Sequence, residues 1–172
     1  MSNSSKLSQK QEPKKVYRQN AALILERKDR KILICERLDC KDAWQFPQGG
    51  VDEGENPMDA LYREVKEEIG LHRKYYKVLD YREGYRYKFD QRHSKSKYYL
   101  GQEQTYFRCR FSGKNKNIDL NTKKPEFANF SWILPEKFNL EWVPDFKRRV
   151  YIEVFFDFYD LNGTTKLFLR QW

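Results

Sequence analysis

The stretch from Gly49 to Leu71 constrains this chain more than any other, because its glycines, acidic residues and single arginine follow one long pattern. The pattern reads G-x5-E-x7-R-E-U-x-E-E-x-G-U, where U is an apolar residue, and every position matches. At ordinary residue frequencies such a match arises by accident in on the order of one chain in ten million. The match in this stretch is therefore not accidental.

The residues within and around the pattern predict a helix from about Pro57 to Ile69. Asn56 is a favourable N-cap, and proline suits the first turn because its missing N–H needs no partner there. Gly70 fits the left-handed position that ends a helix. Apolar residues three or four positions apart are expected to face the core: Met58, Leu61, Val65 and Ile69.

The same helix carries three glutamates that are neighbours on another side: Glu64, Glu67 and Glu68. Clustered carboxylates repel one another unless a cation lies among them, and such oxygen ligands suit Mg²⁺ or Mn²⁺. A loop carbonyl at Gly49 is a further candidate ligand, since glycine permits close approach. Arg63 and Glu55 are expected to pair and orient the ligands. An isolated E-x-x-E-E is usually a solvated face, but the complete pattern favours a metal site.

Charge is unevenly distributed along the chain, which has a net charge of +9. Residues 49–71 contain seven acidic and two basic side chains, a net charge of −5, which leaves +14 on the remainder. An acidic spot within a basic body suits a metal site whose partner is a polyphosphate or a nucleic acid. Solubility alone explains a basic surface equally well, so charge by itself does not decide between the two.

Length and composition exclude several classes of protein. The 172 residues suggest one domain, without an apolar stretch long enough to span a membrane or to form a secretory signal. Residues 1–15 are polar and lysine-rich, which predicts a disordered basic extension. Three cysteines without a C-x-x-C pair indicate reduced thiols and a cytoplasmic location. The two histidines, His72 and His93, argue against histidine-ligated zinc and histidine-based triads.

The remaining elements predict a mixed α/β fold, with a central sheet between helices. Residues 44–50 are expected to form a loop that leads into the first helix. A second helix is expected over residues 146–159, with helical spacing of its apolar residues. The expected strands cover residues 17–26, 31–37, two short pieces of 76–89 around Gly84, 103–111 and 127–134. Residues 161–172 are expected to form a C-terminal tail.

The long pattern is the Nudix box, and the chain resembles the bacterial RNA pyrophosphohydrolase and dinucleoside polyphosphate hydrolase group of the Nudix family. The run from Trp44 to Glu55 and four further segments carry the resemblance. Gln19 departs from the group's usual proline, and the third segment has two extra residues before its tryptophan. The four segments are Tyr17-Arg18-Gln19-Asn20, Gly101-Gln102-Glu103-Gln104, Pro125–Trp132 and Phe146–Tyr151.

The resemblance implies a Nudix fold, an α/β/α sandwich with a mixed central sheet, over residues 16–160. It also implies that Glu64 and Glu68 are the main ligands of Mg²⁺ or Mn²⁺, with a contribution from Glu67. Glu126 resembles a distant carboxylate that reaches the metal site in this group and activates water or binds an ion. The alternative is an ordinary surface glutamate.

The resemblance further implies a set of substrate-binding residues. Arg18, Arg37 and Lys147 match basic positions that face the triphosphate or the first nucleotides, and guanidinium groups suit phosphate because they donate two bonds at once. Tyr87 is a candidate for contacting phosphate, and Phe146 for stacking on a base. The alternatives are surface charges for the first three and core packing for the two aromatic residues.

The leading hypothesis for function is an RNA 5′-pyrophosphohydrolase that converts 5′-triphosphorylated or diphosphorylated RNA into 5′-monophosphorylated RNA and so primes it for decay. A dinucleoside polyphosphate hydrolase, acting on compounds such as diadenosine tetraphosphate, is the alternative. A non-catalytic Nudix module that binds nucleotides or RNA is a third hypothesis. It is disfavoured because all the carboxylates of the box are present.

Overall fold

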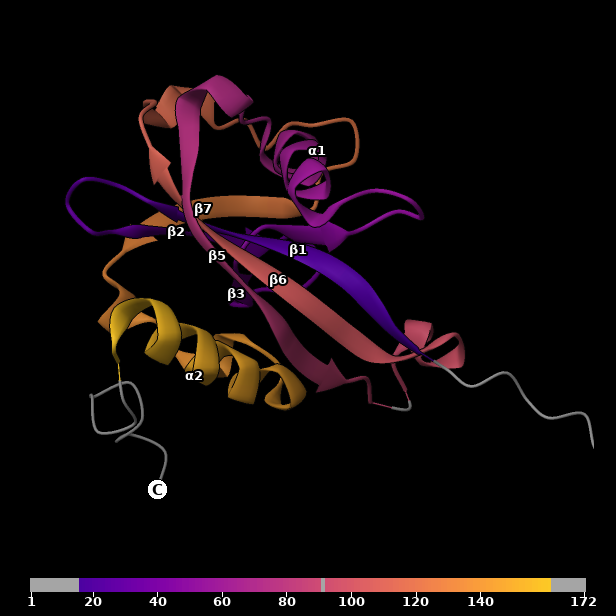
Figure 1. Cartoon of the computed structure of the whole chain (residues 1–172). Helices are drawn as coiled ribbons and strands as arrows, with labels where there is room; N and C mark the ends of the chain where they lie inside the picture. Colours follow the sequence, from indigo (N-terminus) through magenta and orange to yellow (C-terminus); the bar gives the residue numbers. More distant parts are fainter. Residues whose placement is uncertain (1–15, 91, 162–172) are drawn as a thin grey trace, which may run out of the picture.

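The computed structural model describes residues 16–90 and 92–161. The predicted extension (1–15) and all but Leu161 of the predicted tail lie outside this range. The described elements form one mixed seven-stranded sheet with helices on both faces, as predicted (Figure 1). In the described part of the chain, no helix is sufficiently long and apolar to cross a membrane.

Apart from β3 and β4, the strands lie along the chain where the sequence predicted strands, but several of their boundaries differ. The central path runs β3-β2-β1-β6-β5, while β4 pairs with β1 and β7 pairs with β2. All these pairs are antiparallel except β1–β6, which is parallel. The bounds are β1 Val16–Glu26, β2 Ile32–Arg37, β3 Trp44–Gln45, β4 Gln48–Gly50, β5 Tyr76–Lys88, β6 Tyr99–Phe111 and β7 Phe127–Ile133.

Two sequence-based expectations were wrong in this sheet. Residues 44–50 contain two short strands, β3 and β4, rather than only a loop, and strands this short leave no periodic signal in the sequence. Residues 76–88 form one strand rather than two short pieces. Gly84, with φ of 87°, lies in a register irregularity between Arg82 and Tyr85, which absorbs the turn residue without ending the strand.

Helix α1 spans Pro57–Ile69, the predicted range. The side-chain oxygen of Asn56 accepts hydrogen bonds from the N–H groups of Met58 and Asp59, each at 3.0 Å. Gly70 ends the helix in the left-handed conformation, with φ of 62°. The cap and the terminating glycine thus set both ends of the helix that carries the Nudix box.

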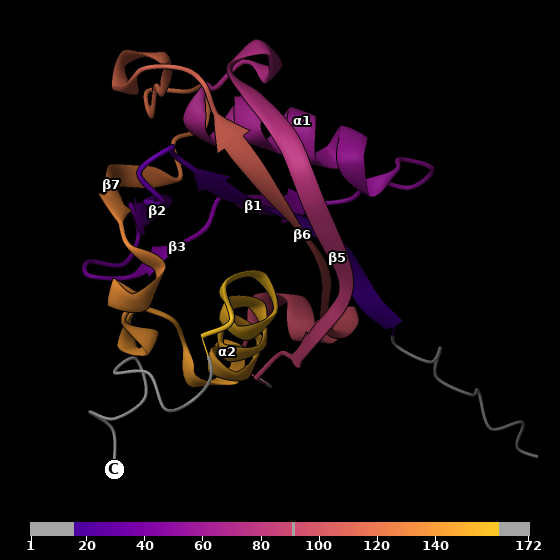
Figure 2. The ribbon, with the colours of Figure 1, turned by 60° about the vertical axis from the view of Figure 1, so that its left-hand side comes forward.

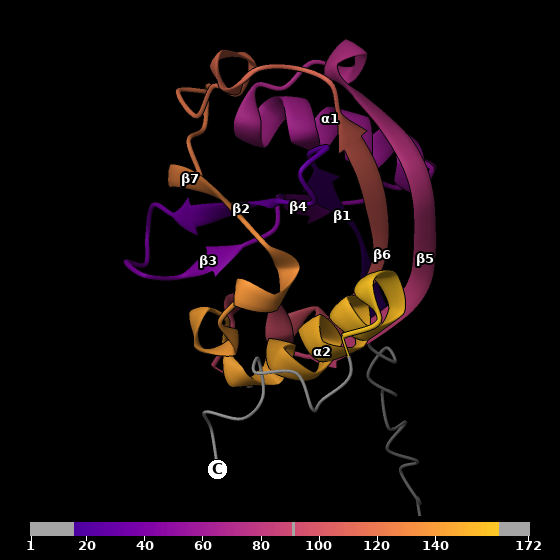
Figure 3. The ribbon, with the colours of Figure 1, turned by 90° about the vertical axis from the view of Figure 1, so that its left-hand side faces the viewer.

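Strand β1 holds the two layers of the core together, because its successive side chains point to opposite faces of the sheet. Ala21, Leu23 and Leu25 pack in the cluster that includes the apolar stripe of α1. Ala22 and Ile24 pack in the other cluster, which includes α2 (Asp145–Tyr159). The views in Figures 2 and 3 show α1 and α2 on opposite sides of the sheet.

The second cluster is rich in aromatic rings that hold the segment between β3 and β4 in place. The ring of Phe46 stacks on that of Tyr151 of α2, with centroids 5.4 Å apart and planes 4° apart. The ring of Phe138 stacks on Tyr151 as well, with centroids 5.0 Å apart. The Phe46 N–H also donates to the Tyr151 hydroxyl, at 3.3 Å. These contacts fix the segment just before Gly49.

We predict that Leu61→Ala lowers the free energy of unfolding by about 2–5 kcal/mol, because Leu61 is 1% exposed between α1 and the sheet. Leu79→Ala is the control, since Leu79 on β5 is 44% exposed, and a change within about 0.5 kcal/mol is expected. Urea unfolding of both variants measures the difference. Equal losses in the two variants would contradict the burial of the α1 stripe.

Candidate active site

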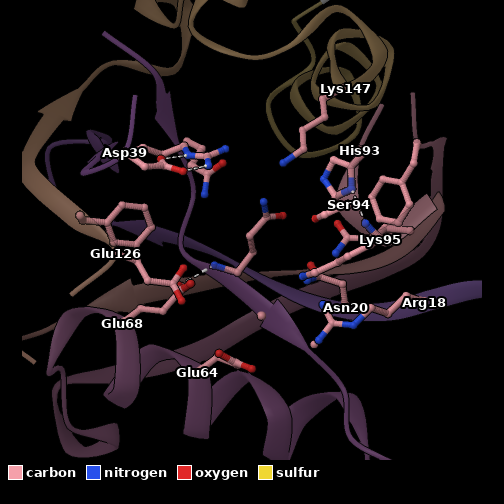
Figure 4. Close-up of a pocket in the computed structure, with 18 of the residues that line it drawn as sticks. Arg18, Asn20, Asp39, Glu64, Glu68, His93, Ser94, Lys95, Glu126 and Lys147 are labelled. Atoms are coloured by element: carbon pink, nitrogen blue, oxygen red, sulfur yellow. Dashed lines mark hydrogen bonds and ion pairs between the residues drawn. The ribbon is translucent and has the colours of Figure 1, made fainter. Parts of the chain in front are cut away.

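The site is a pocket of about 590 Å³ at the end of the sheet where β4 meets α1. Carboxylates and basic side chains line different parts of it (Figure 4). The predicted site residues that line it are Arg18, Arg37, Gly49, Glu64, Glu68, Tyr87, Glu126 and Lys147. Arg63, Glu67 and Phe146 are not among the lining residues.

Arg63 joins the helix to the loop before it. Its Nε and Nη2 donate to the two oxygens of Glu55, at 3.0 and 2.7 Å. Its Nη1 donates to Glu64 Oε1 at 2.7 Å, and its Nη2 also donates to the carbonyl of Gly50 at 2.8 Å. The predicted pairing of Arg63 with Glu55 is therefore present, and the same guanidinium also orients Glu64.

Gly49 lets the Glu64 carboxylate lie directly against the main chain. A Cβ atom at position 49 would stand 1.7 Å from the Glu64 carboxyl carbon. Burial raises the pKa of Glu64 above its ordinary value, although Arg63 opposes this effect. A side chain larger than hydrogen at position 49 would displace this carboxylate from the pocket.

Glu68 is 3% exposed at the base of the pocket. Its Oε2 accepts a hydrogen bond from the N–H of Gln48 at 2.8 Å. Burial raises its pKa well above the ordinary value, and the charge of Glu126 and a hydrogen bond with it raise the pKa further. Two carboxyl groups this close coexist only with a proton or a cation between them.

Glu67 lies outside the pocket, on the exposed side of α1. Its side chain is 61% exposed, and its Oε2 is 3.5 Å from Arg63 Nη1. The sequence placed Glu67 in one group with Glu64 and Glu68. Glu67 nevertheless shares Arg63 with Glu64, so the spacing of the box links these two glutamates to one guanidinium.

The basic residues approach the pocket from several elements. Arg18, on β1, lies over Gly50, where a Cβ atom would stand 2.0 Å from Arg18 Nη2. Arg37, at the end of β2, is held by Asp39 in a two-bond pair, with distances of 2.8 and 2.6 Å. Lys147, on α2, is 9% exposed, and its Nζ lies 5.5 Å from the centre of the Tyr87 ring.

Of the two aromatic candidates, only Tyr87 lines the pocket. Tyr87 is 5% exposed, and its hydroxyl hydrogen-bonds to Gln102. Phe146 packs against the Tyr87 ring, with centroids 5.5 Å apart, and is only partly buried. Tyr87 therefore lines the pocket with its hydroxyl already engaged, and Phe146 lies behind it.

A buried amide network, to which the sequence assigned no role, lies below the basic side chains. Gln104 Nε2 donates to Asn20 Oδ1 at 2.9 Å and also to the side-chain oxygen of Gln48. The Tyr106 hydroxyl donates to Gln104 Oε1 at 2.9 Å. The available signal was a run of polar residues in each of two strands, Arg18 to Asn20 in β1 and Gln102 to Thr105 in β6.

Comparisons with known proteins show the family of this chain. A family model described as the NUDIX domain matches residues 16–154. This chain belongs to the Nudix family. Nudix hydrolases generally use divalent metal ions. The box helix of this chain contributes two carboxylates to the pocket, those of Glu64 and Glu68.

The match with each of three relatives covers most of the length of that relative. Nudix hydrolase 26, chloroplastic, of Arabidopsis thaliana is 38% identical over 86% of this chain and 71% of that protein. The RNA pyrophosphohydrolase of Nitratiruptor sp. is 43% identical over 82% of this chain and 92% of that protein. The RNA pyrophosphohydrolase of Helicobacter pylori (strain G27) is 42% identical over 81% of this chain and 92% of that protein.

Solved structures show the same fold. The dihydroneopterin triphosphate pyrophosphohydrolase of E. coli matches 82% of this chain and 97% of its own, with a TM-score of 0.58 and 22% identity. An Ap4A hydrolase of C. elegans matches 68% of this chain and 80% of its own, with a TM-score of 0.51 and 20% identity. At these identities the likeness concerns the Nudix fold alone.

The donor set of the pocket fits a hard divalent cation. In the described ranges, no group of three or more His, Cys, Asp or Glu side chains forms a finished ligand cage. Mg²⁺ usually binds one or two carboxylates and keeps waters and substrate phosphates as its other ligands, so it does not need such a cage. The charge of Glu126 raises the pKa of Glu68, and a cation between these two carboxyl groups would relieve their repulsion. The residues present therefore suit Mg²⁺ or Mn²⁺.

We predict that Lys147→Met raises the free energy of unfolding of the protein by about 1–3 kcal/mol at pH 7. Burial, with the charges of Arg37 and Lys95, lowers the pKa of Lys147 to about 8. Below that pH the lysine is charged in both the folded and the unfolded chain, and only the folded chain carries the cost of burial. As the pH rises from about 8 to above 10, the folded chain loses this proton first, and the advantage of the variant disappears.

Urea unfolding at pH 7, 9 and 10 measures this difference. Lys97→Met is the control, because Lys97 is exposed. A Lys147→Met protein that is less stable than the wild type at pH 7, or whose advantage is the same at every pH, would contradict the prediction.

Proposed function

We propose that this Nudix hydrolase removes pyrophosphate from the 5′ end of triphosphorylated RNA and leaves a 5′ monophosphate. The observation that carries the proposal is the 42–43% identity to two bacterial RNA pyrophosphohydrolases over 92% of their length. The pocket supports it, because it combines carboxylates for a metal with basic groups for a chain of phosphates. The product, a 5′-monophosphorylated RNA, would be primed for decay.

The basic side chains bind the 5′ triphosphate in this proposal. Arg18 and Lys147 form no salt bridge with any described residue, so each has a charge available for phosphate. Arg37 is already paired with Asp39, so it donates to phosphate with the nitrogen that Asp39 leaves unbound. Binding of phosphate offsets the cost of keeping Lys147 buried and charged.

The carboxylates would hold Mg²⁺ or Mn²⁺ at the other side of the pocket. Glu64 and Glu68 would be the main ligands, the carbonyl of Gly49 would be a further candidate, and Glu67 would contribute from the outer side of α1. A divalent ion held there would neutralise phosphate charge and activate a water molecule. Arg63 keeps Glu64 oriented through the bond of 2.7 Å between them.

Glu126 is the residue proposed to take the proton from the attacking water. It is exposed at the mouth of the pocket, whereas its neighbour Glu68 is buried and bonded to the Gln48 N–H. Its exposure gives Glu126 a route by which to pass that proton on to solvent, whereas Glu68 is assigned to the metal. Tyr87 and Phe146 remain candidates for phosphate contact and base stacking.

We predict that the protein with Mg²⁺ releases label from RNA whose 5′ β- or γ-phosphate is labelled, and leaves a 5′-monophosphorylated product. The same RNA labelled at its α-phosphate is the control, because that label stays with the RNA in this reaction. Thin-layer chromatography of the products and electrophoresis of the RNA measure both. Absence of release from every RNA tested would refute the proposal.

The alternative substrate is a dinucleoside polyphosphate, such as diadenosine tetraphosphate. The resemblance of the sequence to a group that includes such hydrolases favours it, and the pocket would bind its phosphates with the same basic groups. A ratio of kcat/KM for triphosphorylated RNA over diadenosine tetraphosphate well above one supports the proposed function. A ratio well below one makes the alternative the main activity.

We predict that Glu68→Gln reduces turnover by about 10³-fold or more, because the loss of a metal ligand removes several kcal/mol of transition-state stabilisation. Folding stays intact, since the amide oxygen of glutamine still accepts from the Gln48 N–H and a neutral group is cheaper to bury. Glu83→Gln, at an exposed site on β5, is the control and keeps full activity. Turnover that survives in a folded Glu68→Gln protein would exclude this ligand assignment.

A further inference from the structure

The segment between β5 and β6 enters the wall of the pocket. Its 3₁₀ turn η2 spans Ser94–Lys97, and three consecutive residues line the pocket: His93, Ser94 and Lys95. Figure 4 shows Lys95 on the same side as Arg18 and His93, across the pocket from Glu126. No role was assigned to this segment from the sequence.

The position of this turn is fixed by contacts that do not use the Lys95 side chain. The His93 ring stacks on the Phe89 ring, with centroids 4.2 Å apart and planes 3° apart. His93 Nδ1 accepts a hydrogen bond from the Lys95 N–H at 3.2 Å, and the Tyr98 N–H donates to the Lys95 carbonyl at 3.1 Å. The main chain therefore holds Lys95 at the pocket whatever its side chain does.

The charges around Lys95 are those of the active site itself. The carboxylates of Glu126 and Glu64 attract its ammonium group, and Arg18 repels it. Partial burial and Arg18 together lower the pKa of Lys95 from its ordinary value. No carboxylate in the described residues lies within salt-bridge distance of it. A cation that lies near other cations, with no carboxylate of the described residues within salt-bridge distance, indicates an anionic ligand.

We propose that Lys95 is a further substrate-binding residue, whose ammonium group contacts the terminal phosphates of the 5′ polyphosphate between Arg18 and the carboxylates Glu64 and Glu126. The inference rests on the proposed function for the identity of the substrate. It adds a residue from the β5–β6 segment to the basic groups of β1, β2 and α2. Phosphates bound between these basic groups and the metal ligands would lie next to the reacting centre.

The neighbouring lysine provides a comparison within the same turn. Lys95 and Lys97 are both exposed by solvent accessibility, but only Lys95 lines the pocket. Both lysines have the same charge and lie two residues apart, so they contribute about equally to long-range attraction of RNA. Only Lys95 is placed to distinguish a terminal phosphate from the remainder of the RNA backbone.

The test compares Lys95→Ala, Lys95→Arg and Lys97→Ala with the wild type. Binding is measured in EDTA, without turnover, to an RNA with a 5′ triphosphate, to the same RNA with a 5′ hydroxyl, and to inorganic tripolyphosphate. A charge-assisted hydrogen bond to phosphate predicts about tenfold or greater loss for Lys95→Ala on both phosphate ligands. For the 5′-hydroxyl RNA, Lys95→Ala is expected to lose little affinity, about as much as Lys97→Ala loses.

Turnover with Mg²⁺ gives a second measurement. Lys95→Ala is expected to raise KM for triphosphorylated RNA by about tenfold or more. Lys95→Arg is expected to recover most of this loss, because arginine keeps the charge. Equal melting temperatures of the variants confirm that the fold is unaffected. Lys95→Ala values equal to those of Lys97→Ala, or equal losses on the triphosphate and hydroxyl RNAs, would overturn the inference.

The failure of the proposed function is distinguishable from the failure of this inference. Wild-type protein that releases no label from any RNA refutes the RNA substrate. A loss of tripolyphosphate binding in Lys95→Ala would still establish the phosphate contact in that case. Full tripolyphosphate binding by Lys95→Ala refutes the contact, whether or not the wild type hydrolyses RNA.

Discussion

The guanidinium group of Arg63 is the interaction on which the rest of the site depends. It bonds to Glu55 before the helix, to Glu64 on the helix and to the carbonyl of Gly50 in β4. Because β4 pairs with β1, this one side chain ties the box helix to the centre of the sheet. Charge-assisted bonds of this kind hold their partners in defined positions. The carboxylates thus have a rigid frame before any ligand binds.

Apart from the Arg37–Asp39 pair, the pocket keeps its carboxylates and its basic groups apart. Glu64 and Glu68 come from α1, while Arg18, Lys95 and Lys147 come from β1, the β5–β6 segment and α2. Burial raises the pKa of Glu68 and lowers that of Lys147, so both groups are costly to keep charged in the free protein. A metal ion and a polyphosphate would relieve both costs together. The site therefore trades some stability of the free protein for affinity.

Much of the fold could be predicted because its signals are local. The cap, the apolar stripe and the terminating glycine of α1 lie within a few residues of one another, and the predicted helix from Pro57 to Ile69 has the observed bounds. The short strands β3 and β4 could not be predicted, since their pairing depends on β2 and β1 rather than on their own residues. The same holds for the unbroken course of β5 through Gly84, which pairing with β6 maintains.

The sequence by itself determined the family, the box helix and the pairing of Arg63 with Glu55, because these depend on spacings along one short segment. Only the tertiary structure decided which distant residues meet. The parallel pairing of β1 with β6 sets Asn20 beside Gln104, the course of the chain after β6 brings Glu126 to Glu68, and the β5–β6 segment brings Lys95 to the pocket. These contacts depend on strand register and on the packing of the whole core, so they cannot be predicted from the spacing of residues within one segment.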